Sequence, residues 1–565
     1  MTEPRRDSRW WGWGDPDVPT ELGEAAERML GERGISTGAD ASPPEIDRVE
    51  IPEAVPVDER VLSAAGAENV FTGNEDRIRH ANGQNYLDLL ELREGRLQHA
   101  PDAVIVADSG PRIAAILEAC ASAGVAVVPF GGGSSVVGGV TPLKGDHESV
   151  ISLDLAGLRG IEVDDRSLTA KLGAGLRGPE AEALLAERGF TLGHYPQSFE
   201  YATIGGFAAT RSAGQSSSGY GRFDSLVSSI RLITPEGELS TLSTPHTSIG
   251  PALREVVVGS EGILGVIPDV DVRIRPLPAA RRYEAWIVED FEAGCEIVRG
   301  LAQADRLPTI IRVSDDSETE VNLAMALPSG AAGSLFRRYL KLRGREGGAL
   351  VITGYEGSPA AVHRSRSDVA REIRRGGGVY LGQAAGKGWE KGRFHGPYLR
   401  EALLERGVLV ETLETVEGAG LVGSRLVYPT LRLQESGGIV WRDGSAWNWG
   451  RNDDPDRPEY NYLREVDYCS GACLMTPTQL FLEQGGFDER YLPAYCEDTD
   501  YCLGLAARGL RVMYQPAAYI VHFEGLSHGT DTAEGIKAHQ VANLRTLGER
   551  WRTLLAGTRY RGDFE

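Results

Sequence analysis

The chain has 565 residues, which is enough for roughly three or four domains of about 150 residues each. Aspartate and glutamate outnumber lysine and arginine by 81 to 59, the net charge is −22, and no block is rich in lysine or arginine. This balance excludes a protein that tracks nucleic-acid phosphates, because such a protein needs a basic face. The 71 glycines fall in loops between apolar segments, which is typical of a loop-rich α/β enzyme.

The apolar runs of the sequence are far shorter than the ~20 residues that a transmembrane helix needs. The basic pair Arg5 and Arg6 is followed by Trp10 to Gly14 and not by the apolar core of a secretory signal. We therefore expect a cytoplasmic protein with no integral membrane segment. The six cysteines are too few for a disulfide scaffold and their spacing does not fit a zinc site, so we expect reduced cysteines in the core.

The first part of the chain predicts an arm followed by a mixed α+β domain. Residues 1 to about 60 are rich in proline, glutamate, aspartate and glycine, and we expect them to pack loosely at the periphery, with one short helix at 21–30. A strand at 103–107, a helix at 111–123 and a strand at 125–130 then form a βαβ-like unit. Further elements are predicted as strands at 151–153, 168–172 and 227–234 and a helix at 179–188.

The pattern changes near residue 281 and again near 414–420. Strands at 283–288 and 349–354, with helices at 291–304 and 360–374, resemble half of a ferredoxin-like substrate lid. A tryptophan-rich, acidic and cysteine-bearing segment follows the second change. We therefore divide the chain into 1–96, 97–279, 280–415 and 416–565.

A glycine-rich loop follows the predicted strand at 125–130. Residues 129–140 read Pro-Phe-Gly-Gly-Gly-Ser-Ser-Val-Val-Gly-Gly-Val. Successive glycines allow several N–H groups to converge on an anion, and no Cβ blocks its approach. The loop is suited to a pyrophosphate, although a solvated turn has the same composition.

Three more glycine-rich patches occur within about 140 residues of this loop. They lie at 193–206, 210–214 and 259–267. Several such loops are expected where one extended cofactor is held from many sides. The four loops together therefore predict a cofactor site.

Residues from about 79 to 415 resemble a known family. The resemblance is carried by these loops and by Arg79-His80, Gly83-Gln84, Asp88-Leu89 and Pro101 to Val104. It comprises the FAD-dependent alkyldihydroxyacetonephosphate synthases and related flavin oxidases of the vanillyl-alcohol oxidase superfamily. The resemblance implies an FAD-binding domain at 97–279 and a substrate cap at 280–415. It implies FAD contacts from Pro129, Phe130, Gly131, Gly132, Gly133, Ser134 and Ser135 around the diphosphate, from Gln197, Ser198, Phe199, Glu200, Tyr201, Ala202, Thr203, Thr210, Arg211, Ser212 and Ala213 along the flavin, and from Glu261, Gly262, Ile263, Leu264, Gly265, Val266 and Ile267.

Three arginines, Arg211, Arg312 and Arg400, are candidates for contact with the flavin or the substrate. Arg211 either lines the flavin or forms a surface salt bridge. Arg312 and Arg400 lie where the family places groups that face the substrate, and a planar, charged fork suits a phosphate or carboxylate. In a helix, Arg400 has only leucines at i+3 and i+4, so we expect no local acid to pair with it; its other interpretation is a solvated charge.

The resemblance stops near Thr415. The family continues with a catalytic tyrosine and a histidine cluster, whereas this chain has ten histidines with no adjacent pair. Flavin binding does not replace a general acid or base, so we expect impaired catalysis. The cap is therefore expected to be partial.

Residues 418–552 resemble the C-terminal half of family-two glycosyltransferases, which implies a partial α/β, GT-A-like segment. The match includes 420–426, 433–438, 467–472, 485–489 and 497–500. By resemblance Asp498 would be the base that deprotonates an acceptor hydroxyl, whereas its other interpretation is a helix cap. The nucleotide-binding half of such enzymes has no counterpart here.

Three functions follow from these observations. The first is an FAD oxidoreductase, in which the flavin accepts electrons from a substrate carbon or, as in the synthases, bonds to the substrate. The second is a glycosyltransferase that uses a nucleotide sugar, and the third is a chimeric chain that binds FAD without efficient turnover. The expected partner is a small-molecule substrate bearing a phosphate or carboxylate, and a homodimer is the default oligomer.

Overall fold

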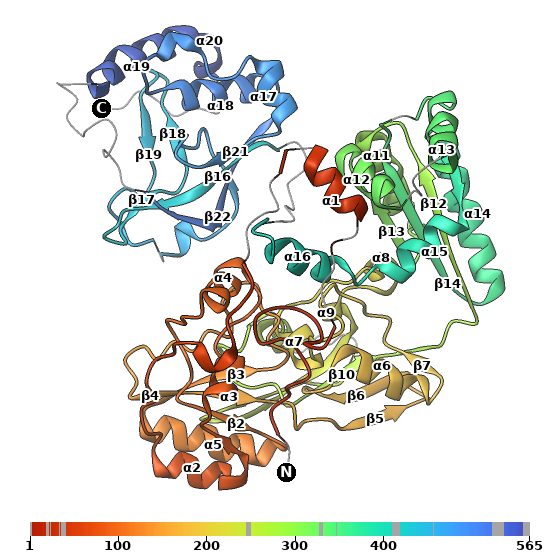
Figure 1. The fold of residues 1–565 in the computed structure, drawn as a ribbon, viewed down its shortest axis with the longest axis vertical. Helices are drawn as coiled ribbons and strands as arrows, with labels where there is room; N and C mark the ends of the chain where they lie inside the picture. Colours follow the sequence, from red (N-terminus) through yellow and green to blue (C-terminus); the bar gives the residue numbers. More distant parts are fainter. Residues whose placement is uncertain are drawn as a thin grey trace. The chain divides into compact units, whose positions relative to one another are not determined.

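The computed structural model describes residues 3–18, 22, 24–32, 34–35, 41–244, 250–326, 331–345, 347–409, 419–455, 457–522 and 536–557. The chain forms two compact units, residues 1–410 and 411–565 (Figure 1). The predicted change near 414–420 falls mostly outside the described residues.

The first sheet of the larger unit has four strands in the order β1 (Val70–Phe71), β2 (Ala103–Val106), β4 (Ser149–Asp154) and β3 (Val125–Phe130). Strands β2, β4 and β3 are parallel. Helix α5 (Gly110–Ala123) makes the crossover and packs against α2 (Glu59–Ala65) (Figure 1). The predicted strand-helix-strand unit is confirmed, and it delivers the glycine loop to the carboxyl end of β3, a usual position for ligand loops.

The second sheet is antiparallel, in the order β5 (Ile161–Asp164), β6 (Thr169–Gly173), β10 (Asp269–Arg273), β8 (Val227–Thr234) and β9 (Gly237–Ser240). Its core includes side chains from four helices, α6 (Gly178–Ala186), α7 (Ile204–Ala209), α9 (Phe223–Leu226) and α10 (Leu253–Val257). The short strands β7 (Phe190–Thr191) and β11 (Arg275–Pro276) pair with each other, and α8 (Ser217–Tyr220) lies between α7 and α9 in the chain. The predicted α+β character of this region is confirmed.

The cap contains a third sheet, antiparallel, in the order β13 (Ile310–Val313), β14 (Leu350–Gly357), β12 (Ala280–Ile287) and β15 (Val379–Gly382). Its helices are α11 (Phe291–Gln303), α12 (Asp316–Ala326), α13 (Ala331–Leu342) and α14 (Pro359–Arg375). The expectation of half a ferredoxin-like lid was wrong in one respect. All four strands of a βαββαβ motif are present, because β13 and β15 complete the order around β12 and β14. Helices α15 (Gln383–Gly392) and α16 (Gly396–Leu404) follow the sheet.

The segment before the first sheet contains α1 (Glu24–Glu32), α3 (Asn74–Arg79), α4 (Tyr86–Glu94) and two short 3-10 turns (Ile46–Arg48 and Ala67–Asn69). The expectation that residues 1–60 pack loosely was wrong for its first part. Trp10 and Trp13 are only 9% and 4% exposed. Trp10 packs in a cluster with Val49 and Ile78, because large aromatic rings bury enough apolar area to fix an otherwise polar segment.

The smaller unit has a mixed sheet in the order β17 (Leu433–Glu435), β16 (Ala419–Val427), β22 (Arg511–Val521) and β20 (Arg464–Glu465), with β21 (Leu474–Met475) on β16. Strands β16 and β22 are parallel, and β18 (Gly438–Val440) pairs with β19 (Ala446–Asn448). Three more 3-10 turns occur in this unit, at Pro458–Tyr460, Glu489–Tyr491 and Ile536–Ala538. Its helices are α17 (Thr478–Gln484), α18 (Glu497–Ala507), α19 (His539–Arg550) and α20 (Arg552–Leu555).

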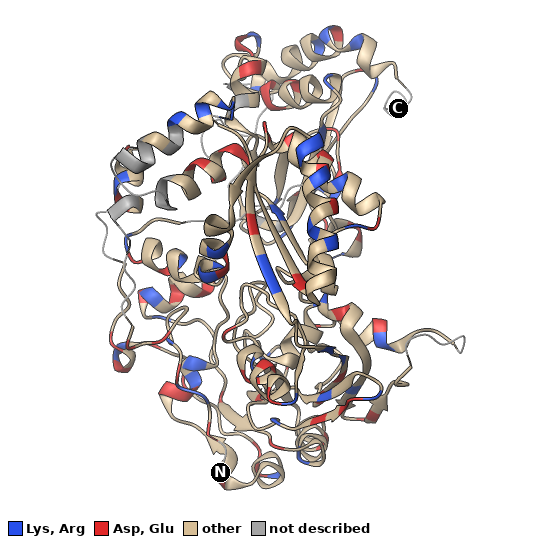
Figure 2. Cartoon of the chain, turned by 90° about the vertical axis from the view of Figure 1, so that its right-hand side faces the viewer, with Lys and Arg blue, Asp and Glu red and all other residues tan. Residues whose placement is uncertain are grey.

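Basic and acidic residues are interspersed along the same helices, as Figure 2 shows. Among the described residues, no helix is both long and apolar enough to cross a membrane. No disulfide joins the six cysteines, of which four are buried: Cys120, Cys469, Cys496 and Cys502. Within the described ranges, no group of three or more histidine, cysteine, aspartate or glutamate side chains is placed to hold a metal ion.

Candidate functional site

The glycine loop after β3 packs directly against the predicted flavin loop at 197–203. A Cβ on Gly132 would lie 2.1 Å from the carbonyl oxygen of Tyr201, and one on Gly131 would lie 2.5 Å from Oγ1 of Thr203. Gly133 has φ +63°, a conformation that other residues rarely adopt. Glycine is therefore required here by close approach of two backbones, which is the arrangement expected of a cradle for a cofactor.

The 197–203 loop ends in the N-cap of α7. Thr203 accepts a hydrogen bond from the backbone N–H of Gly206 at 3.3 Å, so the side chain that touches Gly131 also fixes the start of the helix. The other end of this loop contacts the cap. Phe199 stacks on Phe394 with ring centroids 5.1 Å apart, and the Tyr398 hydroxyl donates to Glu200 Oε2 at 2.9 Å.

The fourth loop is joined by backbone hydrogen bonds to the end of α7, directly before the third loop. Glu261 N–H donates to the carbonyl oxygen of Ala209 at 2.9 Å, and Gly259 N–H donates to that of Ala208 at 3.0 Å. Arg211 and Glu261 both have positive φ, +49° and +50°, although neither is glycine. A strained backbone conformation of this kind persists only where the surrounding structure stabilises it, and such residues are common at ligand-binding sites.

Arg211 is engaged within the protein. Its guanidinium pairs with Asp224 at 3.3 Å and with Glu255 at 3.1 Å, and the side chain is 34% exposed. This contact is the salt bridge of the second interpretation. The neighbouring Ser212 Oγ lies 3.0 Å from Nε2 of His194, a buried ring whose pKa is lowered to about 4 by burial.

The fourth loop divides between solvent and core. Ile263 is 85% exposed and Leu264 is 41% exposed, whereas Val266 and Ile267 are buried in the two sheets' cores. Gly262 packs against the ring of Pro129, with its Cβ position 3.3 Å from Cγ. The structure therefore brings the beginning of this loop to the glycine loop and the end of it into the core.

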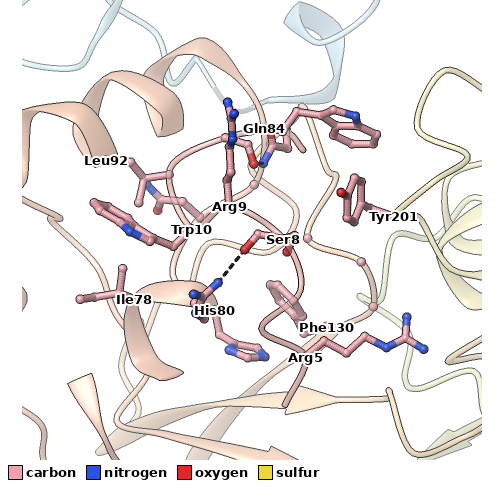
Figure 3. Close-up of a pocket in the computed structure, with 18 of the residues that line it drawn as sticks. Arg5, Ser8, Arg9, Trp10, Ile78, His80, Gln84, Leu92, Phe130 and Tyr201 are labelled. Carbon is pink, nitrogen blue, oxygen red and sulfur yellow. Dashed lines mark hydrogen bonds between the residues drawn. The ribbon is translucent and has the colours of Figure 1, made fainter. Parts of the chain in front are cut away.

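A cavity lies beside the glycine loop and Tyr201, and no residue of the third or fourth loop lines it (Figure 3). Of the predicted cofactor residues, Phe130, Gly131, Gly132, Gly133 and Tyr201 line it. In the view of Figure 3, His80, Phe130 and Arg5 lie along the lower side, with Tyr201 and Gln84 opposite. Its remaining lining comes mainly from α3, the residues after α3, and residues 5–14.

The lining of the cavity is basic. Four arginines contribute to it, Arg5, Arg9, Arg79 and Arg177, against the carboxylate of Asp154. That carboxylate is itself engaged, because Asp154 Oδ2 lies 3.2 Å from His80 Nε2 and Oδ1 accepts from the Ala156 N–H at 2.8 Å. The cavity thus combines several guanidinium groups with the backbone N–H groups of a glycine loop. Both the positive charge and the arrangement of donors suit a diphosphate.

Sequence reasoning missed the contribution of residues 5–14. Their signal was present, because Trp10-Trp11-Gly12-Trp13-Gly14 combines large rings with glycine close to Arg5. Trp13 packs edge-on against Tyr201, with centroids 4.9 Å apart. Nothing in the local pattern indicated that this segment reaches a loop almost 190 residues further along the chain.

Arg400 lies in α16, and the expectation that no local acid pairs with it was wrong. Its Nη2 donates to Glu401 Oε1 at 2.8 Å and to Gln84 Oε1 at 2.9 Å, and its Nη1 donates to the Gln84 carbonyl at 3.0 Å. Glu401, the next residue along the helix, can pair with Arg400 because the Arg400 guanidinium lies along the helix surface and reaches the buried Glu401 carboxylate. Arg400 is thus a half-buried charge beside the cavity residue Gln84, and not a solvated one.

Two predicted catalytic residues lie elsewhere. Arg312 is on β13 of the cap sheet, pairs with Glu318 and has a side chain 42% exposed. Asp498 lies in the first turn of α18, in the smaller unit. Its Oδ2 accepts from the Gly471 N–H at 2.8 Å and its Oδ1 from the Thr499 N–H at 2.7 Å, so it also satisfies backbone donors at a helix start.

The chain matches two protein families. Residues 101–243 match the FAD binding domain, and residues 277–417 match the C-terminal domain of FAD linked oxidases. These two matches cover the strands from β2 to β9 and the whole cap sheet. The larger unit therefore contains an FAD-binding domain followed by an FAD-linked oxidase domain.

Its relatives include alkyldihydroxyacetonephosphate synthases. The one from Dictyostelium discoideum is 30% identical over 347 residues, which are 60% of this chain and 57% of the relative. The one from Trypanosoma brucei brucei is 29% identical over 450 residues, which are 74% of this chain and 73% of the relative. A solved alkyldihydroxyacetonephosphate synthase superposes with a TM-score of 0.65 and 27% identity, covering 71% of this chain and 78% of that one.

FAD is therefore the cofactor of this chain, and the fold is that of the vanillyl-alcohol-oxidase type. The residues present fit it. Gly131 and Gly132 leave no room for a Cβ, and Arg5 has a buried Nη1 without a hydrogen-bond partner in the described part of the chain. Both features are expected of a site for a diphosphate.

Proposed function

We propose that this chain is an FAD-binding oxidoreductase of the alkyldihydroxyacetonephosphate synthase class, acting on a small molecule that bears a phosphate or carboxylate. The observation that carries the proposal is the basic cavity beside Gly131 to Gly133, which belong to the matched FAD-binding domain. Bound FAD supplies electron transfer to or from a substrate carbon. The glycine loop and the arginines orient and neutralise its diphosphate.

Arg400 supports an anionic substrate. Its Nε is buried and has no hydrogen-bond partner among the described residues, so the fork keeps a donor for a phosphate or carboxylate. Helix α16, which carries it, follows Phe394, and that ring stacks on the predicted flavin loop through Phe199. In this proposal Arg400 binds the substrate, and Arg312 on β13 attracts it from the cap.

Turnover in this proposal is impaired. The resemblance implies a catalytic tyrosine and a histidine cluster after Thr415, and the chain has no two adjacent histidines. Proton transfer by a placed acid or base contributes about 10²- to 10⁴-fold to rates, so we expect the lack of the histidine cluster to slow turnover by that order.

The visible spectrum of the purified protein tests the proposal. We expect flavin absorbance, either as purified or after reconstitution with FAD, and slow anaerobic bleaching by dihydroxyacetone phosphate esters. A colourless protein that takes up no FAD would contradict the whole proposal. Fast bleaching would contradict impaired turnover alone.

A second candidate function concerns the smaller unit, for which we propose the acceptor half of a glycosyltransferase. Support comes from two neighbouring carboxylates, Asp498 and Glu435. Glu435 is buried on β17, its Oε1 accepts from the Ser470 N–H at 2.8 Å, and burial together with the Asp498 charge raises its pKa to about 8. A carboxyl group with a raised pKa beside a second carboxyl group suits general acid and base roles. Release of nucleotide diphosphate from sugar donors tests it: release that is lost in Asp498→Asn would support the assignment, and no release would contradict it.

A chimeric origin, a homodimer and a cytoplasmic location stay predictions. Sequencing the gene across codons 415–418 tests whether the join is natural. Light scattering of the purified chain measures its oligomeric state.

A further inference from the structure

Residues 3–18, here called the N-terminal segment, cross the cavity that holds the glycine loop. Arg5, Ser8, Arg9 and Trp10 line it, as do three residues from Gly12 to Gly14. Figure 3 shows Arg5, Ser8 and Arg9 beside Phe130, which ends β3. The N-terminal segment therefore forms part of the cavity wall.

The first residues of the segment are fixed to the FAD-binding domain by charged contacts. Arg5 Nη2 donates to the Gly175 carbonyl at 3.0 Å and to Glu180 Oε2 at 2.8 Å. The Asp7 carboxylate accepts hydrogen bonds from both terminal nitrogens of Arg177, from Nη1 at 2.7 Å and from Nη2 at 2.9 Å. A bidentate pair of this kind holds both partners in one orientation.

The next contacts hold the other side of the segment. Arg6 Nη2 donates to the two carboxylate oxygens of Asp76, at 2.9 and 3.1 Å. The Ser8 carbonyl accepts from Arg79 Nη1 at 2.8 Å, the bond drawn in Figure 3. Four successive residues are thus bonded to four different places around the cavity.

Arg5, like Arg177 of the same cavity, has a buried guanidinium nitrogen without a hydrogen-bond partner in the described residues. Its Nη1 is buried and has no hydrogen-bond partner in the described residues, although Nη2 has two. Burial, together with the charges of Arg177 and Arg159, lowers the pKa of Arg5 to about 10. A buried donor without a partner is costly, and an anion in the cavity would remove that cost.

The geometry points to Arg5 as a ligand of the FAD diphosphate, with the N-terminal segment as a strap that closes over the nucleotide. This inference rests on the proposed FAD site and adds to it a residue far from the glycine loop in sequence. The loop supplies backbone N–H groups and contains no basic residue, and Arg5 adds its positive charge to that of the other lining arginines, Arg9, Arg79 and Arg177.

The affinity of the apoprotein for FAD tests the role of Arg5. FAD is titrated into wild type, Arg5→Gln and Arg6→Gln, and binding is followed by quenching of tryptophan fluorescence. Loss of a charge-assisted hydrogen bond is expected to weaken FAD binding about ten- to a hundredfold in Arg5→Gln. Arg6→Gln is the matched control, because Arg6 does not line the cavity and is 47% exposed; we expect a change within about twofold.

A second measurement keeps the inference testable if Arg5→Gln does not fold. Hydrogen–deuterium exchange of residues 3–18 in the wild-type protein is compared without ligand, with FAD and with inorganic pyrophosphate. Both ligands should slow exchange in the segment, and high salt should reduce the effect of pyrophosphate.

The outcomes separate the two proposals. If wild type binds no FAD, the proposed function fails and this inference fails with it. If wild type binds FAD but Arg5→Gln binds equally well, or if FAD leaves exchange in residues 3–18 unchanged, the strap is wrong and the proposed function stands. Weaker binding in Arg5→Gln with an unchanged melting temperature of the apoprotein supports the inference.

Discussion

Arg93 of α4 and Glu401 of α16 are 308 positions apart and form a buried ion pair, with 2.7 Å between Nη2 and Oε2. Their side chains are 3% and 0% exposed. Glu401 also accepts from Arg400, and Arg93 donates to the Trp11 carbonyl at 2.7 Å. A Cβ on Gly12 would lie 2.1 Å from Glu401 Oε2, so the N-terminal segment packs onto this pair.

The substitution Glu401→Gln should destabilise the larger unit by about 3–5 kcal/mol. The reason is that Arg93 would be left buried with no opposite charge. Chemical denaturation followed by tryptophan fluorescence measures this loss. The control is Glu372→Gln, whose partner Arg375 is 69% exposed, and we expect it to cost less than about 1 kcal/mol. Equal losses in the two variants would refute the argument from burial.

The substitution Gly132→Ala should weaken FAD binding by about tenfold or more. A Cβ at this position meets the backbone of Tyr201 and Ala202, so the two loops that form the cradle must separate. Gly160→Ala is the control in the same domain, because a Cβ there meets nothing within 4 Å. Reconstitution of the apoproteins with FAD, followed by absorbance, gives both affinities; unchanged binding in Gly132→Ala would argue against the cradle.

The stability of the larger unit should rise with pH between about 4 and 6.5 because of His194. Burial between Phe207 and Phe223 lowers its pKa to about 4, whereas the unfolded chain has the ordinary value near 6.5. In that window the unfolded state binds more protons, so stability increases with pH, by at most about 3 kcal/mol. Urea denaturation at several pH values measures the slope.

The variant His194→Phe removes the titrating group and keeps a ring in the same place. Its stability should depend less on pH between 4 and 6.5 than that of wild type. An identical slope in the two proteins would show that other groups cause the dependence.

The stability of the smaller unit should fall as pH rises from about 4.5 to about 8. Burial raises the pKa of Glu435 to about 8, and the folded state then binds more protons than the unfolded state in this window. Hydrogen–deuterium exchange of peptides from 419–522, corrected for the intrinsic pH dependence of exchange, reports this stability. In Glu435→Gln the trend should flatten, and a trend as steep as in wild type would disprove the assignment.

Local patterns predicted many elements of the larger unit closely. The strand at 227–234 has the predicted bounds. The helix predicted at 291–304 begins as predicted, after the N-cap residue Asp290, and ends one residue earlier, at Gln303. The strands β13 and β15 were missed because four residues carry too little periodicity to be recognised. In the smaller unit, Val466 and Cys469 are buried and β21 pairs with β16.

By itself the sequence determined the glycine loop at the end of β3 and the prediction of FAD, because both depend on backbone freedom and strand context within a few residues. Only the tertiary structure decided which charges meet there. Arg5 reaches Glu180, and Arg93 reaches Glu401, across 175 and 308 positions. Such pairs depend on how the elements pack, and no local pattern of residue types specifies a partner at that distance.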